Sequence, residues 1–181
     1  MNLDFFILDL IQTHLRCGFL DTLMPAVTEL GDGGIFFLLC AATLLLFPKT
    51  RRVGAAMAIG LVLEAVCCNL IVKPLVARPR PCDLRAVQLL IPRPGGFSFP
   101  SGHTAVAFTA AFSFYFSRSR LWLPALVLAA LIAFSRLYLY VHYPTDVLAG
   151  AMLGVMVGWF ACALVRLTRK FFSRRGHSLN S

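Results

Sequence analysis

Long apolar segments alternate with short charged clusters along most of the chain. Five segments are apolar enough to cross a bilayer, whose hydrocarbon core of about 30 Å needs about 20 helical residues. They cover residues 33–47, 53–76, 104–116, 121–140 and 147–167. Lipid satisfies no backbone hydrogen bonds, and these segments lack the alternation of a membrane β-strand. We therefore expect five transmembrane helices.

The first thirty residues are less regular. Residues 2–16 and 19–30 are apolar but are interrupted by Asp4, Asp9, Asp21 and Glu29. This pattern suits one broken span or two interfacial helices equally well. With a sixth span from this region, the expected fold is an all-α integral membrane bundle of about six helices. It forms a single domain over residues 1–181, with the N-terminal helices in 1–30, the core spans in 33–167 and a basic tail in 168–181.

Composition agrees with a membrane protein. The chain is 59% hydrophobic and only 14% charged, too little charge to wet the surface of a soluble domain of 181 residues. Its net charge of +9 is a property that many nucleic-acid-binding proteins share. Here, however, the cations stand in short clusters between apolar segments, so membrane topology explains them better than nucleic acid does.

The distribution of Lys and Arg predicts the orientation. Ten of the 17 cations fall on one side when the spans are counted, in residues 49–52, 118–120 and 166–175. The positive-inside rule assigns that side to the cytoplasm. The opposite, outer side still carries six cations, more than orientation requires: Lys73, Arg78, Arg80, Arg85, Arg93 and Arg136.

Three motifs also fall on the outer side. Residues 73–81 (Lys-x6-Arg-Pro) close the second span, residues 100–103 (Pro-Ser-Gly-His) open the third, and residues 135–146 (Ser-Arg-x5-His-x3-Asp) join the fourth to the fifth. Because successive spans alternate in direction, we expect the motifs to meet at one membrane depth. Their order and spacing resemble those of the type-2 phosphatidic acid phosphatase superfamily, a family of membrane-embedded helical phosphatases. Every motif position is filled.

The resemblance implies a phosphate site. Phosphoryl transfer spreads negative charge over equatorial oxygens, which Lys73, Arg80 and Arg136 are suited to bind. Ser101 and Gly102 precede a helix whose free N–H groups and positive end attract anions. No metal and no cofactor are expected, and the sequence shows no carboxylate cluster for a metal.

Two histidines divide the work, as the resemblance implies. His142 attacks phosphorus and forms a phosphohistidine, while Asp146 orients and stabilises its ring. His103 protonates the leaving oxygen and then activates water.

Other polar residues have simpler interpretations. Asn69 lies one turn from Lys73 and is expected to orient it. Glu64 is expected to make a structural hydrogen bond or ion pair inside the bundle. Arg78 is interpreted as an anchor whose side chain reaches toward the membrane–water interface. Arg85 and Arg93 are interpreted as contacts to lipid headgroups or as loop charges. Cys17 and Cys82 lie outside the apolar segments, so a pairing between them stays open.

The expected function is hydrolysis of a lipid phosphate at the outer face of a cell membrane. Undecaprenyl diphosphate is the favoured substrate, and phosphatidylglycerophosphate or phosphatidic acid is the alternative. A non-catalytic transporter or scaffold is a weaker reading because all motif positions are filled. A vanadium-dependent haloperoxidase would have similar motifs. Those enzymes are large and soluble, however, so the five predicted spans argue against this reading. The partners are lipids, not nucleic acid, and the oligomeric state stays open.

Overall fold

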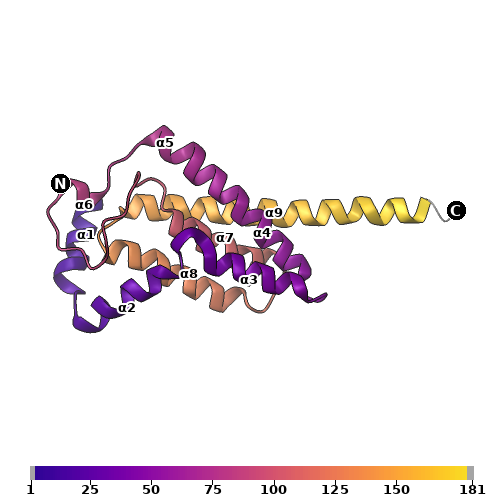
Figure 1. Ribbon diagram of the computed structural model, residues 1–181, viewed down its shortest axis with the longest axis horizontal. Helices are drawn as coiled ribbons and strands as arrows, with labels where there is room; N and C mark the ends of the chain where they lie inside the picture. Colours follow the sequence, from indigo (N-terminus) through magenta and orange to yellow (C-terminus); the bar gives the residue numbers. More distant parts are fainter. Residues whose placement is uncertain (1–2, 179–181) are drawn as a thin grey trace.

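The helices follow from apolar segments that end at glycine, proline or clustered charges. A computed structural model describes residues 3–178, and side chains as far as residue 169. No strand occurs in this range. The elements are α1 Leu3–His14, α2 Gly18–Glu29, η1 Asp32–Gly34, α3 Ile35–Leu46, α4 Arg51–Ala65, η2 Val66–Val72, α5 Lys73–Val76, α6 Pro81–Leu84, α7 Gly102–Phe116, α8 Trp122–Tyr138 and α9 Pro144–Ser178 (Figure 1).

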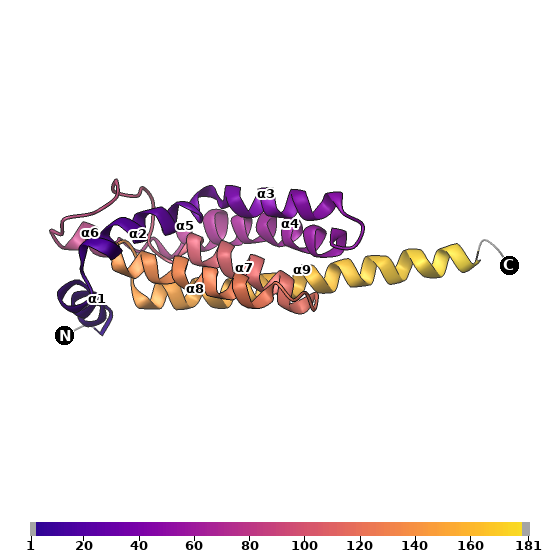
Figure 2. The ribbon, with the colours of Figure 1, turned by 90° about the horizontal axis from the view of Figure 1, so that it is seen from below.

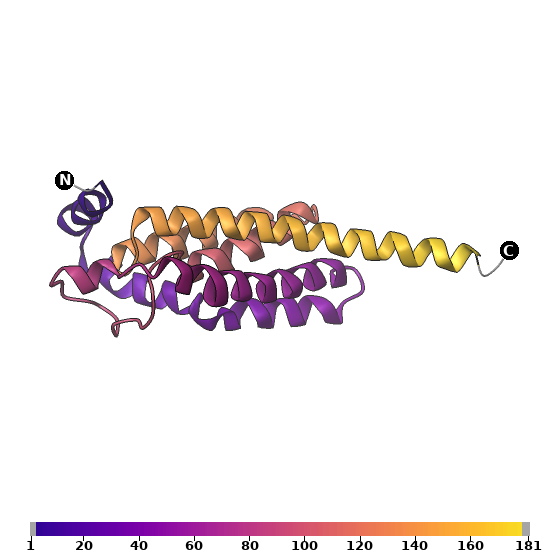
Figure 3. The same ribbon diagram turned by 90° about the horizontal axis from the view of Figure 1, so that it is seen from above.

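The helices form an elongated bundle with two distinct ends. The turn from α3 to α4 and the turn from α7 to α8 lie toward one end (Figure 2). Helices α1 and α6 and the long loop before α7 lie at the other. Helix α9 starts at this second end, runs along the bundle and extends past the first (Figure 3). The three motifs therefore all reach the end that holds α1 and α6.

Helix α7 is the centre of the bundle and packs against α4, α8 and α9. Its buried residues are small, and they include Ala105, Ala107, Ala110 and Ala111. Small side chains let helix backbones approach closely, which is how helices associate where water provides no driving force.

A row of glycines fixes α9 against α7. Gly150, Gly154 and Gly158 recur every fourth residue and so share one face of α9. A Cβ at Gly150 would lie 2.5 Å from the carbonyl oxygen of Ser101, and one at Gly154 equally close to that of Ala105. Only glycine fits such an approach. This contact holds the start of α9 beside the start of α7, where two of the motifs lie.

Two described helices are long and apolar enough to cross a membrane, within 51–84 and 144–169. Helix α8 is apolar but has only 17 residues. Helices α2 and α3 together provide a third candidate, bent by 42° at η1. The count of six spans thus remains a prediction.

The N-terminal region departs from the interpretation of residues 2–30 as one broken span. The bent pair of helices that could form one span is α2 with α3, rather than α1 with α2. Helix α3 has 12 residues, about 18 Å, which is too short to cross alone. Gly33 and Gly34 have φ of +56° and +68°, a conformation that side chains disfavour, and they make the bend.

Two further expectations can be compared with the structure. Helix α9 continues through Ser178, beyond the span predicted for residues 147–167, and that span falls within the candidate span 144–169; residues 179–181 of the predicted tail lie outside the described range. Cys17 and Cys82 do not pair, since both thiols are free; Cys17 is exposed and Cys82 buried.

Candidate active site

Arg80 is held in place by backbone carbonyls. Its guanidinium donates to the carbonyl oxygens of Gly95, Gly96 and Val141 at 3.0–3.1 Å, and the side chain is 4% exposed. No carboxylate neutralises it among these contacts. The loop before α7 therefore folds around a fixed positive charge.

The Nη1 atom of Arg80 also lies 3.1 Å from Nε2 of His142. A guanidinium can donate a hydrogen bond but cannot accept one. This contact therefore requires an unprotonated Nε2, with the ring proton on Nδ1. The lone pair of Nε2 faces the cation that would hold a phosphate.

The other side of the His142 ring faces Asp146. Nδ1 of His142 lies 3.5 Å from Oδ2 of Asp146, and the Ser98 hydroxyl lies equally far from Nδ1. The Ser98 hydroxyl donates to Oδ2 of Asp146, which also accepts from the backbone N–H of Tyr143 at 2.9 Å. The Asp146 carboxylate is thus fixed in front of the nitrogen that carries the proton.

His142 is 2% exposed and neutral. Its pKa is lowered to about 3, by burial first and also by the nearby charges of Arg136 and Arg80, whereas Asp146 acts in the opposite direction. A neutral ring is the form with a free lone pair, as a nucleophile requires.

Arg78 ties the N-terminal helix to this site. It donates to Oδ1 of Asp146 at 2.6 Å and to Oδ2 of Asp4 at 2.7 Å. Asp4 also accepts from the hydroxyl of Thr145 at 2.8 Å. The interpretation of Arg78 as an anchor that reaches toward the interface is therefore wrong: its side chain connects α1 to the start of α9.

Ser101 and Gly102 stand at the start of α7, as the sequence predicts. Ser101 is buried, and its backbone N–H donates to the carbonyl oxygen of Asp146 at 3.1 Å. A Cβ at Gly102 would lie 3.5 Å from Nζ of Lys73. Lys73 donates to Asn69 at 2.8 Å, which confirms that Asn69 orients it.

His103 pairs with a residue that the sequence did not single out. Its Nε2 lies 2.6 Å from Oδ1 of Asp32 in η1, and a Cβ at Gly31 would lie 2.7 Å from the ring. The bend between α2 and α3 therefore holds this imidazole on two sides.

Arg136 is buried, and its positive charge acts on both His103 and His142. Its Nη1 donates to the hydroxyl of Thr28 at 2.6 Å. Its Nε is buried and has no partner among the described residues, so this donor is free for another acceptor.

A cavity of about 310 Å³ opens beside His103. Its polar lining includes His103, Lys73, Asn69 and Glu64, while Leu38, Leu61, Val62 and Val106 provide apolar walls. His142 does not line it. Glu64, expected to make a structural hydrogen bond or ion pair, lines the same cavity as Lys73, and its Oε1 is buried without a partner among the described residues.

The remaining cations of this end are paired. Arg85 contacts Asp9, and Arg93 contacts Asp83, in exposed ion pairs. Both are loop charges, as one of the two sequence interpretations held. Within the described residues, no group of three or more His, Cys, Asp or Glu side chains could hold a metal ion.

Comparisons with known proteins agree with this arrangement. An Undecaprenyl-diphosphatase of Sulfolobus acidocaldarius is 33% identical over 122 residues, which cover 66% of this chain and 59% of that protein. This chain thus spans about three fifths of that relative's length.

Two solved structures are similar in fold. The crystal structure of Aquifex aeolicus LpxE has a TM-score of 0.76 at 31% identity and covers 89% of this chain and 95% of its own. A PAP2 type phosphatidylglycerolphosphate phosphatase from Bacillus subtilis has a TM-score of 0.65 at 25% identity, with 92% of each chain covered. The PAP2 superfamily model matches residues 49–170, which contain all three motifs. The chain belongs to the PAP2 superfamily, a family of membrane phosphatases that act on lipid phosphates.

Proposed function

We propose that the protein hydrolyses the terminal phosphate of undecaprenyl diphosphate through a phosphohistidine on His142. The observation that carries this proposal is the contact between Arg80 and Nε2 of His142, 3.1 Å long. It leaves the lone pair of Nε2 unprotonated and places it beside a fixed cation. A phosphate bound by that cation would present its phosphorus to the same nitrogen.

The first step forms the bond between Nε2 and the terminal phosphorus and breaks the bond from phosphorus to the bridging oxygen. The leaving oxygen takes the proton of His103, and undecaprenyl phosphate departs. The His142 ring now carries positive charge, which the Asp146 carboxylate stabilises. Lys73, Arg80 and Arg136, with the hydroxyl of Ser101 and the N–H group of Gly102, bind the equatorial oxygens.

The second step consumes water. His103 accepts a proton from the water as its oxygen attacks phosphorus, and the bond from phosphorus to Nε2 breaks. Inorganic phosphate leaves, and His142 returns to its neutral form. The cations supply the charge that a metal would supply, so we expect full activity in excess chelator; loss of all activity there would contradict this mechanism.

The cavity beside His103 supports a lipid substrate. The apolar walls of this cavity lie beside His103, the residue that would protonate the leaving group. The leaving group bears the lipid chain, so the chain would lie toward these walls.

Phosphatidylglycerophosphate is the second candidate substrate, favoured by the similarity to the Bacillus subtilis structure. A side-by-side assay of phosphate release from undecaprenyl diphosphate, phosphatidylglycerophosphate and phosphatidic acid by the purified full-length chain tests the choice. We expect the largest kcat/KM for undecaprenyl diphosphate. A larger value for either phospholipid would overturn the assignment.

We also propose that the site faces the outer side of the membrane. The clusters of Lys and Arg at the far end of the bundle support this orientation. Cys17 is exposed and lies between α1 and α2, where its backbone N–H donates to the hydroxyl of Tyr138 in the last turn of α8. A membrane-impermeant thiol reagent should therefore label Cys17 in intact cells, with a Cys17→Ser variant as the control. Labelling that requires cell lysis would reverse the orientation.

A further inference from the structure

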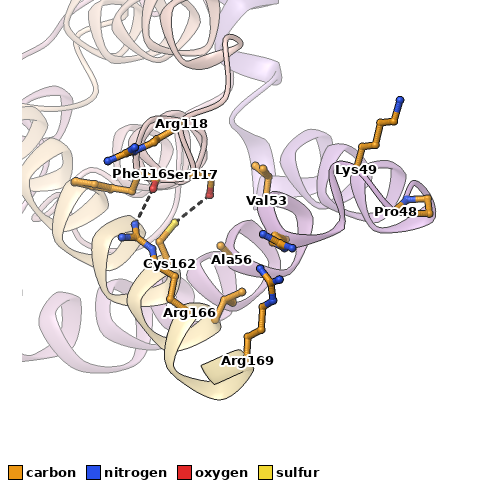
Figure 4. A pocket seen from close by; sticks show the side chains of 12 residues that line it. Pro48, Lys49, Val53, Ala56, Phe116, Ser117, Arg118, Cys162, Arg166 and Arg169 are labelled. Atoms are coloured by element: carbon orange, nitrogen blue, oxygen red, sulfur yellow. Dashed lines mark hydrogen bonds between the residues drawn. The ribbon is translucent and has the colours of Figure 1, made fainter. Parts of the chain in front are cut away.

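A large cavity lies at the end of the bundle opposite the histidines. It has a volume of about 1010 Å³ and is formed by the turn from α3 to α4, the end of α7 and the outer part of α9 (Figure 4). Five of its lining residues are basic: Lys49, Arg52, Arg118, Arg166 and Arg169. They come from three segments far apart in the sequence, so the fold gathers them.

These five charges lack acidic neighbours. Within the part of the chain with described side chains, no carboxylate forms an ion pair with any of them. The last acidic residue of the whole sequence is Asp146, near the other end of α9. Like charges that share one cavity repel each other, and a bound anion relieves that repulsion.

The side chains are placed to receive such an anion. Arg166 and Arg169 project from α9 toward the ends of α7 and α4, whereas Lys49 stands at the rim (Figure 4). The Nη2 atom of Arg166 donates to the carbonyl oxygen of Phe116 at 2.7 Å, which leaves its other donors available. All five cationic side chains are exposed, so a ligand can reach them without any unfolding of the protein.

Exposed apolar residues adjoin the lining residues of the cavity in the sequence. Leu46 and Phe47, just before the turn, are 75% and 58% exposed, and Leu167 on α9 is 63% exposed. A free phosphate ion would not bind to this apolar surface. A ligand with an anionic head and hydrocarbon chains would use both features, as basic pockets between membrane helices do.

We propose that this cavity binds the phosphodiester headgroup of an anionic phospholipid, with its acyl chains along Leu46, Phe47 and Leu167. The lipid would occupy the leaflet opposite the phosphatase site, and it would not be a substrate. The cluster would thus act as a binding site in addition to its effect on topology.

The test compares two double variants of the full-length protein in detergent. Arg52→Gln with Arg169→Gln removes two cavity cations. Arg51→Gln with Arg120→Gln removes two cations from the same end that do not line the cavity. Because each basic residue near an anionic lipid is worth about fivefold in affinity, the first should bind phosphatidylglycerol roughly thirtyfold more weakly than wild type. The second should bind it as wild type does.

The readout is the rise in thermal unfolding midpoint as lipid is titrated. Phosphatidylglycerol should raise the midpoint, whereas phosphatidylcholine with the same chains and water-soluble glycerophosphoglycerol should not. An equal rise with either of these would overturn the proposal, as would equal weakening in both double variants. Native mass spectrometry of the wild-type protein provides a test that needs no variant: absence of a preference for phosphatidylglycerol over phosphatidylcholine would also overturn it.

Discussion

Nη1 of Arg80 lies 3.1 Å from Nε2 of His142, and this contact assigns the imidazole proton to Nδ1. The remaining donors of Arg80 bind carbonyl oxygens of the loop before α7 and of Val141. A cation fixed by neutral groups keeps its full charge for a phosphate. The same residue therefore orders the loop and selects the tautomer of His142, and in the proposed mechanism it would hold the reacting phosphate.

Ser98 should support catalysis through Asp146. Its hydroxyl donates to Oδ2 of Asp146, and a hydrogen bond to a charged group is worth about 1.5–3 kcal/mol. We expect Ser98→Ala to lower kcat on undecaprenyl diphosphate by at least about tenfold with little change in KM. Ser113→Ala removes an equally buried hydroxyl from the last turn of α7 and is the matched control. Equal effects of the two variants on kcat would show that Ser98 has only a packing role.

Asp32 should position and charge His103. The pKa of His103 is lowered to about 4, by burial first and then by Arg136 and Lys73, whereas the 2.6 Å contact with Asp32 acts in the opposite direction and favours the protonated imidazole, the form that donates to the leaving oxygen. We expect Asp32→Asn to slow hydrolysis of phosphatidylglycerophosphate more than that of undecaprenyl diphosphate. The ester has the poorer leaving group and depends more on the proton.

The pH profile separates this role from a structural one. In Asp32→Asn, the alkaline fall of kcat on the ester should move to lower pH, because His103 loses its proton more easily. Asp32→Glu should restore part of the wild-type profile. An unchanged profile with uniformly reduced kcat on both substrates would contradict the assignment.

His142 should contribute to the pH dependence of stability. Its pKa in the folded protein is about 3, because of burial first and then Arg136 and Arg80, against an ordinary value of 6.5. The unfolded chain therefore takes up a proton that the folded protein excludes. The contribution of His142 to stability is full above about pH 6.5 and is lost as the pH falls toward 3. The thermal midpoint of His142→Gln should fall less steeply over this range than that of wild type, and parallel curves would contradict this prediction.

Gly154 should be intolerant of any side chain. Its Cβ would lie 2.5 Å from the carbonyl oxygen of Ala105 and 2.7 Å from Cβ of Phe108. We expect Gly154→Ala to destabilise the protein by about 1–3 kcal/mol through overpacking. Gly95→Ala, where nothing lies within 4 Å, should leave the unfolding midpoint unchanged. Equal midpoints for both variants would show that α7 and α9 separate without cost.

The motifs allowed much of this site to be predicted, since their spacing places His142, Asp146 and Arg80 at the ends of apolar segments. Ser98 and Asp32 were missed for a physical reason. Both residues lie in irregular backbone, where no repeating pattern of residues predicts a position. Ser98 lies in the loop that folds around Arg80, and Asp32 lies in the bend at Gly33 and Gly34. Asp32 is 71 residues from His103, and no pattern of apolar positions reports that contact.

The join between α2 and α3 was missed for a similar reason. The polar residues between 29 and 34 are typical of a loop between separate segments. In the structure, glycines with positive φ make a bend of only 42°, so that α2 and α3 follow one another as a bent pair. The role of Arg78 was hidden because its partners, Asp4 and Asp146, belong to opposite ends of the chain.

Trapping of the phosphohistidine tests the central claim most directly. A His103→Ala variant, given undecaprenyl diphosphate labelled with ³²P in its terminal phosphate, should still form the intermediate because this leaving group needs little protonation. Hydrolysis should be slowed, so label should accumulate on His142 in an alkali-stable, acid-labile form, and His142→Gln should carry none. Turnover by His142→Gln at the wild-type rate, or label on another residue, would contradict the account.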